Sequence, residues 1–445
     1  MKIKSILIWV LTLVFVSNLI ASDIIPGKPQ NKPIALVGGT VHTITNGTIE
    51  NGVVLFDKGK IVAVGKNVNI PKDAEVIDVS GKHIYPGLIN AFTTIGLIEI
   101  GAVRATRDVA EVGLVNPNVR AEISFNPDSE HPPVTRANGI TLALVVPTGE
   151  LIAGQSALMM LDGWTWEEMT LKAPVGLHIY WPRMTQPSGP GFAPARRGPE
   201  ELRREVEKRL QLIRETFQKA RAYKKAKEAE NQQKDIPYHD TDLKYEAMIP
   251  VLEGKVPVFV HANSSKEILS AIEWAESEGV KIVIVGGNDS WKVADVLRAK
   301  NIPVILTNIH RLPSGRDVEY DEPFTVAYKL YKAGVKFCIG GEGGYYNERN
   351  LPYQAATCVA FGLPREEALK AITIYPAEIL GVADKVGSIE VGKDATLIVT
   401  TGDPLEIPTQ VVYEFIQGKK VDLSNRQTKL YEKYLEKYRR LGLLK

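Results

Sequence analysis

The hydrophobic pattern divides the chain into two β-rich ends and a mixed middle. Short β-branched runs broken by Gly, Asn and Asp fill residues 33–83 and 386–422, and such runs predict hairpins. In residues 84–385, apolar runs alternate with helical segments, which is typical of a parallel sheet, closed as a barrel or open. The pattern therefore predicts an α/β fold with a small sheet domain made from both ends. The expected strands of the middle are 140–146, 175–180, 256–261, 281–285, 302–306 and 335–339.

Two amphipathic segments lie outside this alternation. In residues 200–230, apolar side chains recur three and four positions apart, and the opposite face carries Lys, Arg and Glu. We expect this helix, within an insertion at about 187–247, to pack on the body of the protein, with a coiled-coil partner as the alternative. Residues 423–445 predict a second amphipathic helix, which either caps the fold or contacts a neighbouring subunit.

Residues 1–22 have the features of a secretory signal peptide. Lys2 and Lys4 precede an apolar run at 6–15, and small residues such as Ala21 and Ser22 follow it. The run is shorter than the roughly 20 residues of a membrane-spanning helix. We therefore expect cleavage and export to the periplasm or the exterior, with no stable membrane span afterwards. An uncleaved membrane anchor is the alternative.

Composition narrows the function only slightly. The 445 residues carry a net charge of +2, which gives no reason to expect a nucleic-acid partner. Of the two cysteines, Cys338 falls in an expected strand and Cys358 in the helix that follows. Export would permit a disulfide between them, but we favour two small buried side chains.

One motif carries most of the information in the sequence. The run PGLINAFTT at 86–94 resembles the first-strand signature of the amidohydrolase superfamily, in which two metal-binding histidines stand where this chain has Phe92 and Thr94. Further segments are similar, in series, to the imidazolonepropionase-like branch of that superfamily. The resemblance implies a distorted (β/α)8 TIM-like barrel at 84–385 and a β-sandwich domain formed by both termini. The other matching segments are 139–155, 258–263, 350–377 and 387–395.

The resemblance also implies a chemistry. Family members hydrolyse amide-like or other C–N bonds with one or two divalent metals, held by histidines and carboxylates, that lower the pKa of a bound water. This chain keeps the fifth-strand His261, and Glu342 falls near the expected aspartate, whereas Gly286 stands in place of another histidine. A hydrolytic metal site normally has three protein ligands. The metal motif is therefore degenerate. The sequence is compatible with one zinc-like divalent metal and equally with no metal.

The candidate site residues follow from these positions. We expect Glu342 as the catalytic base and His261 as a metal ligand or electrophile, with His178, His261 and Glu342 as the candidate metal ligands. The plainer interpretation of each is a structural histidine or a surface acid. Arg349 and Asn350 follow the last expected strand, and their guanidinium and amide groups can bind a substrate carboxylate. The alternative is that they only pack within the loop. The candidates for substrate binding are Arg349, Asn350, His310 and Gln155.

Two functions follow from these observations. The first is a hydrolase that cleaves a C–N bond in a small exported substrate, such as an N-acyl amino acid, a short peptide or a cyclic amide, at a reduced metal site. The second is a catalytically inactive homologue that binds a ligand or serves as the partner subunit of an intact amidohydrolase relative. Phe92, Thr94 and Gly286 motivate the second hypothesis. The amphipathic helices would form the partner contact or a homo-oligomer.

Overall fold

The computed structural model describes residues 24–185, 198–232, 238–313 and 318–444. The predicted signal peptide at 1–22 lies outside these residues, as does most of the Pro- and Gly-rich start of the predicted insertion. Within the described ranges, no helix is both long enough and apolar enough to cross a membrane.

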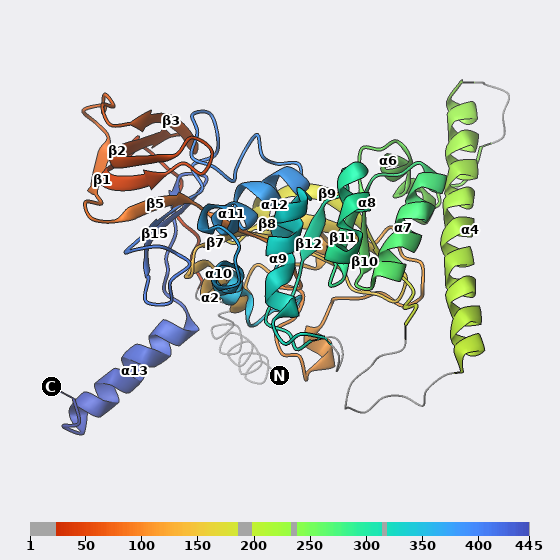
Figure 1. Cartoon of the computed structure of the whole chain (residues 1–445). Helices are drawn as coiled ribbons and strands as arrows, with labels where there is room; N and C mark the ends of the chain where they lie inside the picture. Colours follow the sequence, from red (N-terminus) through yellow and green to blue (C-terminus); the bar gives the residue numbers. More distant parts are fainter. Residues whose placement is uncertain (1–23, 186–197, 233–237, 314–317, 445) are drawn as a thin grey trace, which may run out of the picture.

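An eight-stranded sheet contains strands from both ends of the chain (Figure 1). Its order is β16-β15-β14-β5-β1-β2-β3, with β4 paired to β1. The antiparallel pairing of β5 with β14 joins the N-terminal strands to the C-terminal ones, and Phe56 and Phe415 pack edge to face in the core, 5.1 Å apart. The strands are β1 (Ile34–His42), β2 (Thr48–Asp57), β3 (Lys60–Gly65), β4 (Glu75–Asp78), β5 (His83–Pro86), β14 (Leu397–Thr400), β15 (Val411–Ile416) and β16 (Lys419–Lys420).

A second eight-stranded sheet curls into a nearly closed barrel, which confirms the predicted fold class. Its order follows the chain from β6 to β13, and neighbouring strands are parallel except around β8, which is antiparallel to both β7 and β9. The strands are β6 (Leu88–Thr93), β7 (Ile140–Val145), β8 (Ile152–Met160), β9 (Thr170–Tyr180), β10 (Val258–Ala262), β11 (Ile282–Gly286), β12 (Val304–Leu306) and β13 (Phe337–Ile339).

The antiparallel β8 is a departure from the strand-helix alternation that the sequence predicts. The connection from β7 to β8 covers only residues 146–151. A parallel crossover needs a dozen residues or more, so a connection of this length can only reverse the chain. The apolar run at 152–160 therefore becomes a buried strand of the barrel wall.

The side chain of Asn90 joins the two edge strands of the barrel. Its Oδ1 accepts hydrogen bonds from the backbone N–H of Gly341, at 2.7 Å, and of Phe92, at 3.0 Å. The backbone N–H of Thr94 donates to Gly344 O at 2.9 Å. The first-strand motif thus lies against the segment that follows β13 and helps to close the barrel there.

Helices cover the outside of the barrel. α7 (Ser265–Glu278) shows why they form: a capping box between Ser264 and Glu267 starts it, and Gly279, with a φ of 64°, ends it. Its buried face packs on the barrel strands. The other helical segments are η1 (Arg104–Thr106), η2 (Ala121–Ser124), α2 (His131–Arg136), α3 (Trp166–Met169), α5 (Leu243–Glu246), α6 (Ile249–Leu252), η3 (Ser290–Val293), α8 (Ala294–Ala299), α9 (Glu322–Ala333), η4 (Glu348–Asn350), α10 (Leu351–Ala360), α11 (Arg365–Ala371) and α12 (Ile374–Ile379).

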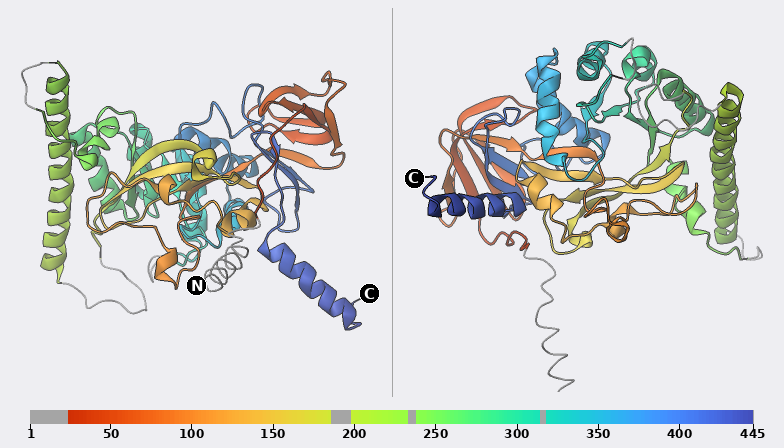
Figure 2. Two further views of the ribbon diagram at one scale, coloured as in Figure 1. Left: turned by 180° about the vertical axis from the view of Figure 1, so that it is seen from behind. Right: turned by 90° about the horizontal axis from the view of Figure 1, so that it is seen from below.

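Two helices extend from opposite ends of the molecule, α4 (Pro199–Gln232) and α13 (Arg426–Arg440) (Figure 2). α4 packs on the body through the middle of its apolar face, where Phe217 meets Trp274 of α7 edge to face at 5.1 Å. In α13, by contrast, no residue is buried. Cys338 and Cys358 are both buried and free, as the sequence favours.

Candidate functional site

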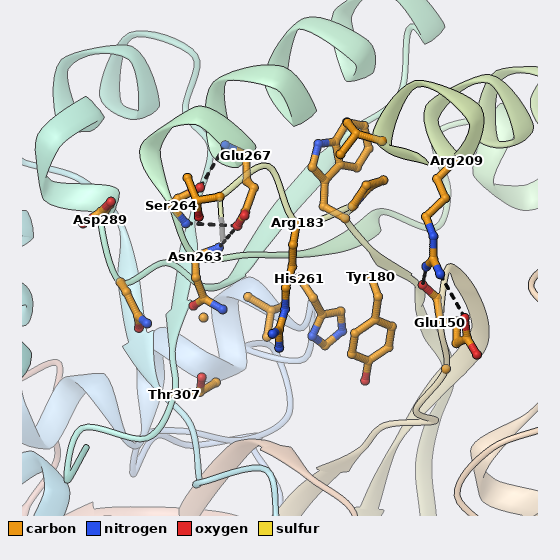
Figure 3. Close-up of a pocket in the computed structure, with 18 of the residues that line it drawn as sticks. Glu150, Tyr180, Arg183, Arg209, His261, Asn263, Ser264, Glu267, Asp289 and Thr307 are labelled. Atoms are coloured by element: carbon orange, nitrogen blue, oxygen red, sulfur yellow. Dashed lines mark hydrogen bonds and ion pairs between the residues drawn. The ribbon is translucent and has the colours of Figure 1, made fainter. Parts of the chain in front are cut away.

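A cavity of about 1040 Å³ opens at the carboxyl ends of β9 to β12 (Figure 3). The parallel strands bring their ends to the same edge of the sheet, which places Tyr180, His261, Gly286 and Thr307 in one wall. α4 supplies the facing side. The residues of the cavity that carry polar side chains include Glu150, Arg183, Glu205, Arg209, Asn263, Ser264, Glu267, Asn288 and Asp289.

His261 stands at the centre of an aromatic cluster. The Tyr180 ring stacks on it, with centroids 3.9 Å apart and 9° between the planes, and the Phe92 ring lies 5.5 Å away. Its Nε2 is 2.9 Å from Nδ1 of His178. Burial lowers the pKa of His261 to about 3. The ring is therefore neutral in neutral solution.

His178 is fully buried and does not line the cavity. Burial, and secondarily the neighbouring His261, lower its pKa well below the ordinary value. A neutral imidazole carries one N–H donor and one acceptor, so the pair shares one hydrogen bond with one ring donating to the other. Nε2 of His178 has no hydrogen-bond partner in the described structure. This pair therefore serves to hold the His261 ring in place.

The residues around His261 do not fit the family's metal site. Phe92 packs at its side, and Thr94 is buried with its hydroxyl donating to Gly344 O at 2.9 Å. Gly286 has a φ of 95°, and a Cβ there would clash with the Asn263 side-chain oxygen, so a histidine could not replace it without rearrangement. Across the described ranges, no three His, Cys, Asp or Glu side chains converge to hold a metal. The predicted ligand set of His178, His261 and Glu342 is therefore not assembled.

Glu342 does not line the cavity either. Its carboxylate accepts a long hydrogen bond from Asn347 Nδ2, at 3.4 Å. The buried acid at this edge is Glu348, whose Oε2 accepts from the Asn90 side chain and whose Oε1 has no partner in the described structure. Burial raises the pKa of Glu348 to about 8. Glu348 lies in a polar segment of the sequence, which does not indicate that its carboxyl group is buried.

The four residues predicted to bind substrate do not line the cavity, and each makes a local contact instead. The Arg349 guanidinium donates to Gln427 at the start of α13, and Asn350 closes η4. His310 Nε2 lies 2.7 Å from Thr357 Oγ1, and Gln155 Nε2 donates to Ala247 O at 3.0 Å. Gln155 lies within β8, His310 follows β12, and Arg349 and Asn350 lie in η4 beyond β13; neighbouring elements satisfy their polar groups.

Arg183 is the most informative of the cavity residues that sequence reasoning missed. It follows β9 by three positions, and in Figure 3 its side chain reaches into the cavity that His261 and Asn263 also line. Within the described ranges it has no ion-pair partner, whereas Arg209 pairs with Glu150 at 3.0 Å. A signal was present in the sequence, because Arg183 follows the apolar end of an expected strand.

The acids of the cavity wall are already satisfied. Glu267 accepts from the backbone N–H groups of Asn263, Ser264 and Met184, at 3.0 to 3.1 Å. Asp289 lies 2.7 Å from Lys292 Nζ. Arg183 is therefore the charged group of the wall that is best able to bind a ligand of opposite charge.

Comparisons with known proteins agree with this architecture. The model of the amidohydrolase family matches residues 167–423. The crystal structure of an amidohydrolase from Thermotoga maritima is 31% identical, with a TM-score of 0.77 over 87% of this chain and 99% of that one. An amidohydrolase of Hapsidospora irregularis, tasK, is 22% identical over 82% of this chain and 39% of its own length.

A shorter match links the chain to imidazolonepropionases. The enzyme of that name from Flavobacterium johnsoniae is 33% identical over 96 residues, which are 21% of this chain and 23% of that protein. The chain thus spans less than half the length of these two curated relatives. The family match nevertheless extends over more than half of the chain, from β9 through the last sheet strands. This protein belongs to the amidohydrolase family.

Proposed function

We propose that this protein is a hydrolase that cleaves a C–N bond in a small molecule bound in the barrel cavity. The observation that carries the proposal is the position of the cavity, at the carboxyl ends of β9 to β12 in an amidohydrolase-family barrel. Enzymes with such barrels carry out their chemistry at this end. The volume of about 1040 Å³ suits a small organic substrate.

Arg183 is proposed to bind an anionic group of the substrate. A guanidinium is always charged and binds carboxylates through two parallel hydrogen bonds. The amide groups of Asn263 and Asn288 and the hydroxyl of Thr307 line the same cavity and can bind further polar atoms of the ligand. An N-acyl amino acid, with its carboxylate beside an amide, meets these requirements.

His261 is proposed to orient and polarise the scissile group. Its Nε2 is engaged by His178, which leaves Nδ1 for a ligand. With its pKa lowered to about 3, the ring is a weak base but a neutral hydrogen-bonding group. Since the residues present do not fit the family's metal, the attacking water would transfer its proton to a carboxylate of the cavity wall, with Asp289 as the candidate, and the leaving nitrogen would take that proton up. We therefore expect slow turnover that persists in the presence of a chelator.

The test is a hydrolysis assay of the purified protein with N-acyl amino acids and small cyclic amides, with and without EDTA. We expect Arg183→Gln to raise KM about 10-fold or more, with little change in kcat, because a hydrogen bond to a charged group contributes about 1.5–3 kcal/mol. His261→Gln should lower kcat. Arg203→Gln is the matched control, because Arg203 is an exposed guanidinium of α4 outside the cavity.

A catalytically inactive, ligand-binding homologue is the second candidate. Two features favour it. The Phe92 ring occupies space beside His261 that a metal would need, and the hydrogen bond with His178 engages Nε2 of His261. Binding of N-acyl amino acids that depends on Arg183, without any turnover, would support this candidate and overturn the first. If the wild-type protein neither hydrolyses these compounds nor binds them through Arg183, both candidate functions are contradicted.

A further inference from the structure

The C-terminal helix α13 stands apart from the other helices and strands that the structure describes. A capping box between Asn425 and Thr428 starts the helix, which explains its regularity in the absence of packing. None of its residues is buried, and it projects away from the sheet domain (Figures 1 and 2). A contact from Gln427 to Arg349 holds its first turn to the body. The remaining turns are exposed.

One side of α13 is apolar and aromatic. Tyr434, Tyr438 and Leu441 follow Leu430 at intervals of four, four and three residues, and Tyr431 lies beside them. This spacing places all five on one face. They are 41% to 67% exposed. An isolated helix with such a face has no folding reason to keep it apolar, so the face fits a binding role.

The adjoining side of α13 is basic. Arg426, Lys429, Lys433, Lys437 and Arg440 recur at three- and four-residue intervals and so form a stripe beside the apolar face. With Arg439, the helix has six cationic residues against Glu432 and Glu436, a formal charge of +4. Glu436 is paired with Arg440 at 2.9 Å. A cationic stripe beside an apolar one is the pattern of helices that lie in the surface of a membrane.

We propose that α13 docks this protein on a membrane surface that contains anionic lipids. Tyr and Leu would enter the boundary between headgroups and acyl chains, where tyrosine is preferred, and the cationic stripe would contact the lipid phosphates. Each Lys or Arg near such a surface contributes about 1 kcal/mol. The barrel cavity would remain open to solvent, because it lies beside α4 at the opposite end of the molecule.

Charge favours a membrane over a second copy of the chain. Pairing two α13 helices would bring two groups of charge +4 together, and repulsion between them would oppose the contact. The helix has 15 residues and is therefore about 22 Å long, and the side-chain contact from Gln427 to Arg349 lies at its first turn. A stable protein interface buries about 800 Å² on each partner. The apolar stripe of a single helix of this length is too narrow to bury that area.

The test is cosedimentation of the full chain with vesicles of phosphatidylcholine alone or mixed with phosphatidylserine. We expect the anionic lipid to increase binding, and Lys429→Gln/Lys433→Gln/Lys437→Gln to reduce this increase more than about 10-fold, since three charges contribute about 3 kcal/mol. Binding should also weaken at high salt. The matched control removes three exposed lysines from α4 instead, through Lys208→Gln, Lys219→Gln and Lys225→Gln.

A second variant, Tyr434→Ser/Leu441→Ser, tests the apolar face. It should reduce vesicle binding without changing thermal unfolding, because neither side chain is buried. Unchanged binding of the α13 lysine variant to anionic vesicles would overturn the proposal. So would elution of the wild-type protein as a dimer that the Tyr434→Ser/Leu441→Ser variant converts to a monomer, because the face would then serve a second copy. The result does not depend on the function proposed for the cavity.

Discussion

Replacement of Arg136 by methionine is expected to lower the free energy of unfolding by about 3–5 kcal/mol, the usual cost of breaking a buried ion pair. Arg136 Nη1 donates to Asp162 Oδ1 at 2.7 Å and to Leu161 O at 2.9 Å, and Nη2 donates to Asp422 O at 3.1 Å. The guanidinium therefore links the barrel to the segment that follows the last sheet strand. Its side chain is only 4% exposed, and that of Asp162 is fully buried.

A second buried carboxyl makes the loss larger. Glu414 of β15 is fully buried, and neither of its oxygens has a partner in the described structure. Burial raises its pKa well above the ordinary value, and the positive charge of Arg136 opposes that shift. Burial likewise raises the pKa of Asp162 against the influence of Arg136. Removing the guanidinium takes away the cation that acts most strongly on both buried carboxyls.

Urea unfolding followed by circular dichroism measures the effect. Arg209→Met is the matched control: its partner Glu150 is 68% exposed, so this variant should lose less than about 1 kcal/mol. In an Arg136→Met background, Asp162→Asn should recover part of the loss, because it removes a buried charge. An Arg136→Met protein as stable as the Arg209→Met control would contradict this account of the cluster.

Glu348 is expected to make the protein less stable as the pH rises. Its pKa is about 8 in the folded state, against 4.5 for an ordinary glutamate. Between these values the folded state holds a proton that the unfolded state has released. The contribution of this bound proton to the free energy of unfolding is complete below about pH 4.5. It is lost progressively as the pH approaches 8, at about 1.4 kcal/mol for each pH unit.

The variant Glu348→Gln isolates this contribution. Glutamine keeps the shape and an oxygen for the Asn90 amide but does not titrate. Between pH 5 and pH 8, its stability relative to wild type should rise by about 4 kcal/mol. Urea unfolding at several pH values checks this, with Glu342→Gln as the control on a neighbouring acid that is not buried. Parallel pH profiles for wild type and Glu348→Gln would show that Glu348 is not protonated in the folded state.

The sequence by itself determined the fold class. β-branched runs at both ends and apolar runs between helices are local signals, because each strand or helix expresses its own periodicity. The motif at 86–94 and the similar segments after it predicted the family, and the family model over residues 167–423 and the Thermotoga maritima structure confirm it. The prediction that Phe92 and Thr94 replace two metal ligands rests on the same motif. The antiparallel β8 was missed, because it follows from the length of one connection and not from periodicity.

The tertiary structure alone decided which side chains share the cavity. Arg349 and Glu342 follow the last barrel strand, as the sequence indicated, but contacts with Gln427 and Asn347 account for their side chains. Arg183, on a different strand end, lines the cavity instead. A side chain's direction and its partners depend on elements far away in the chain, and the periodicity of one segment carries no information about them. For the same reason, only the folded chain shows that α13 keeps its apolar face uncovered.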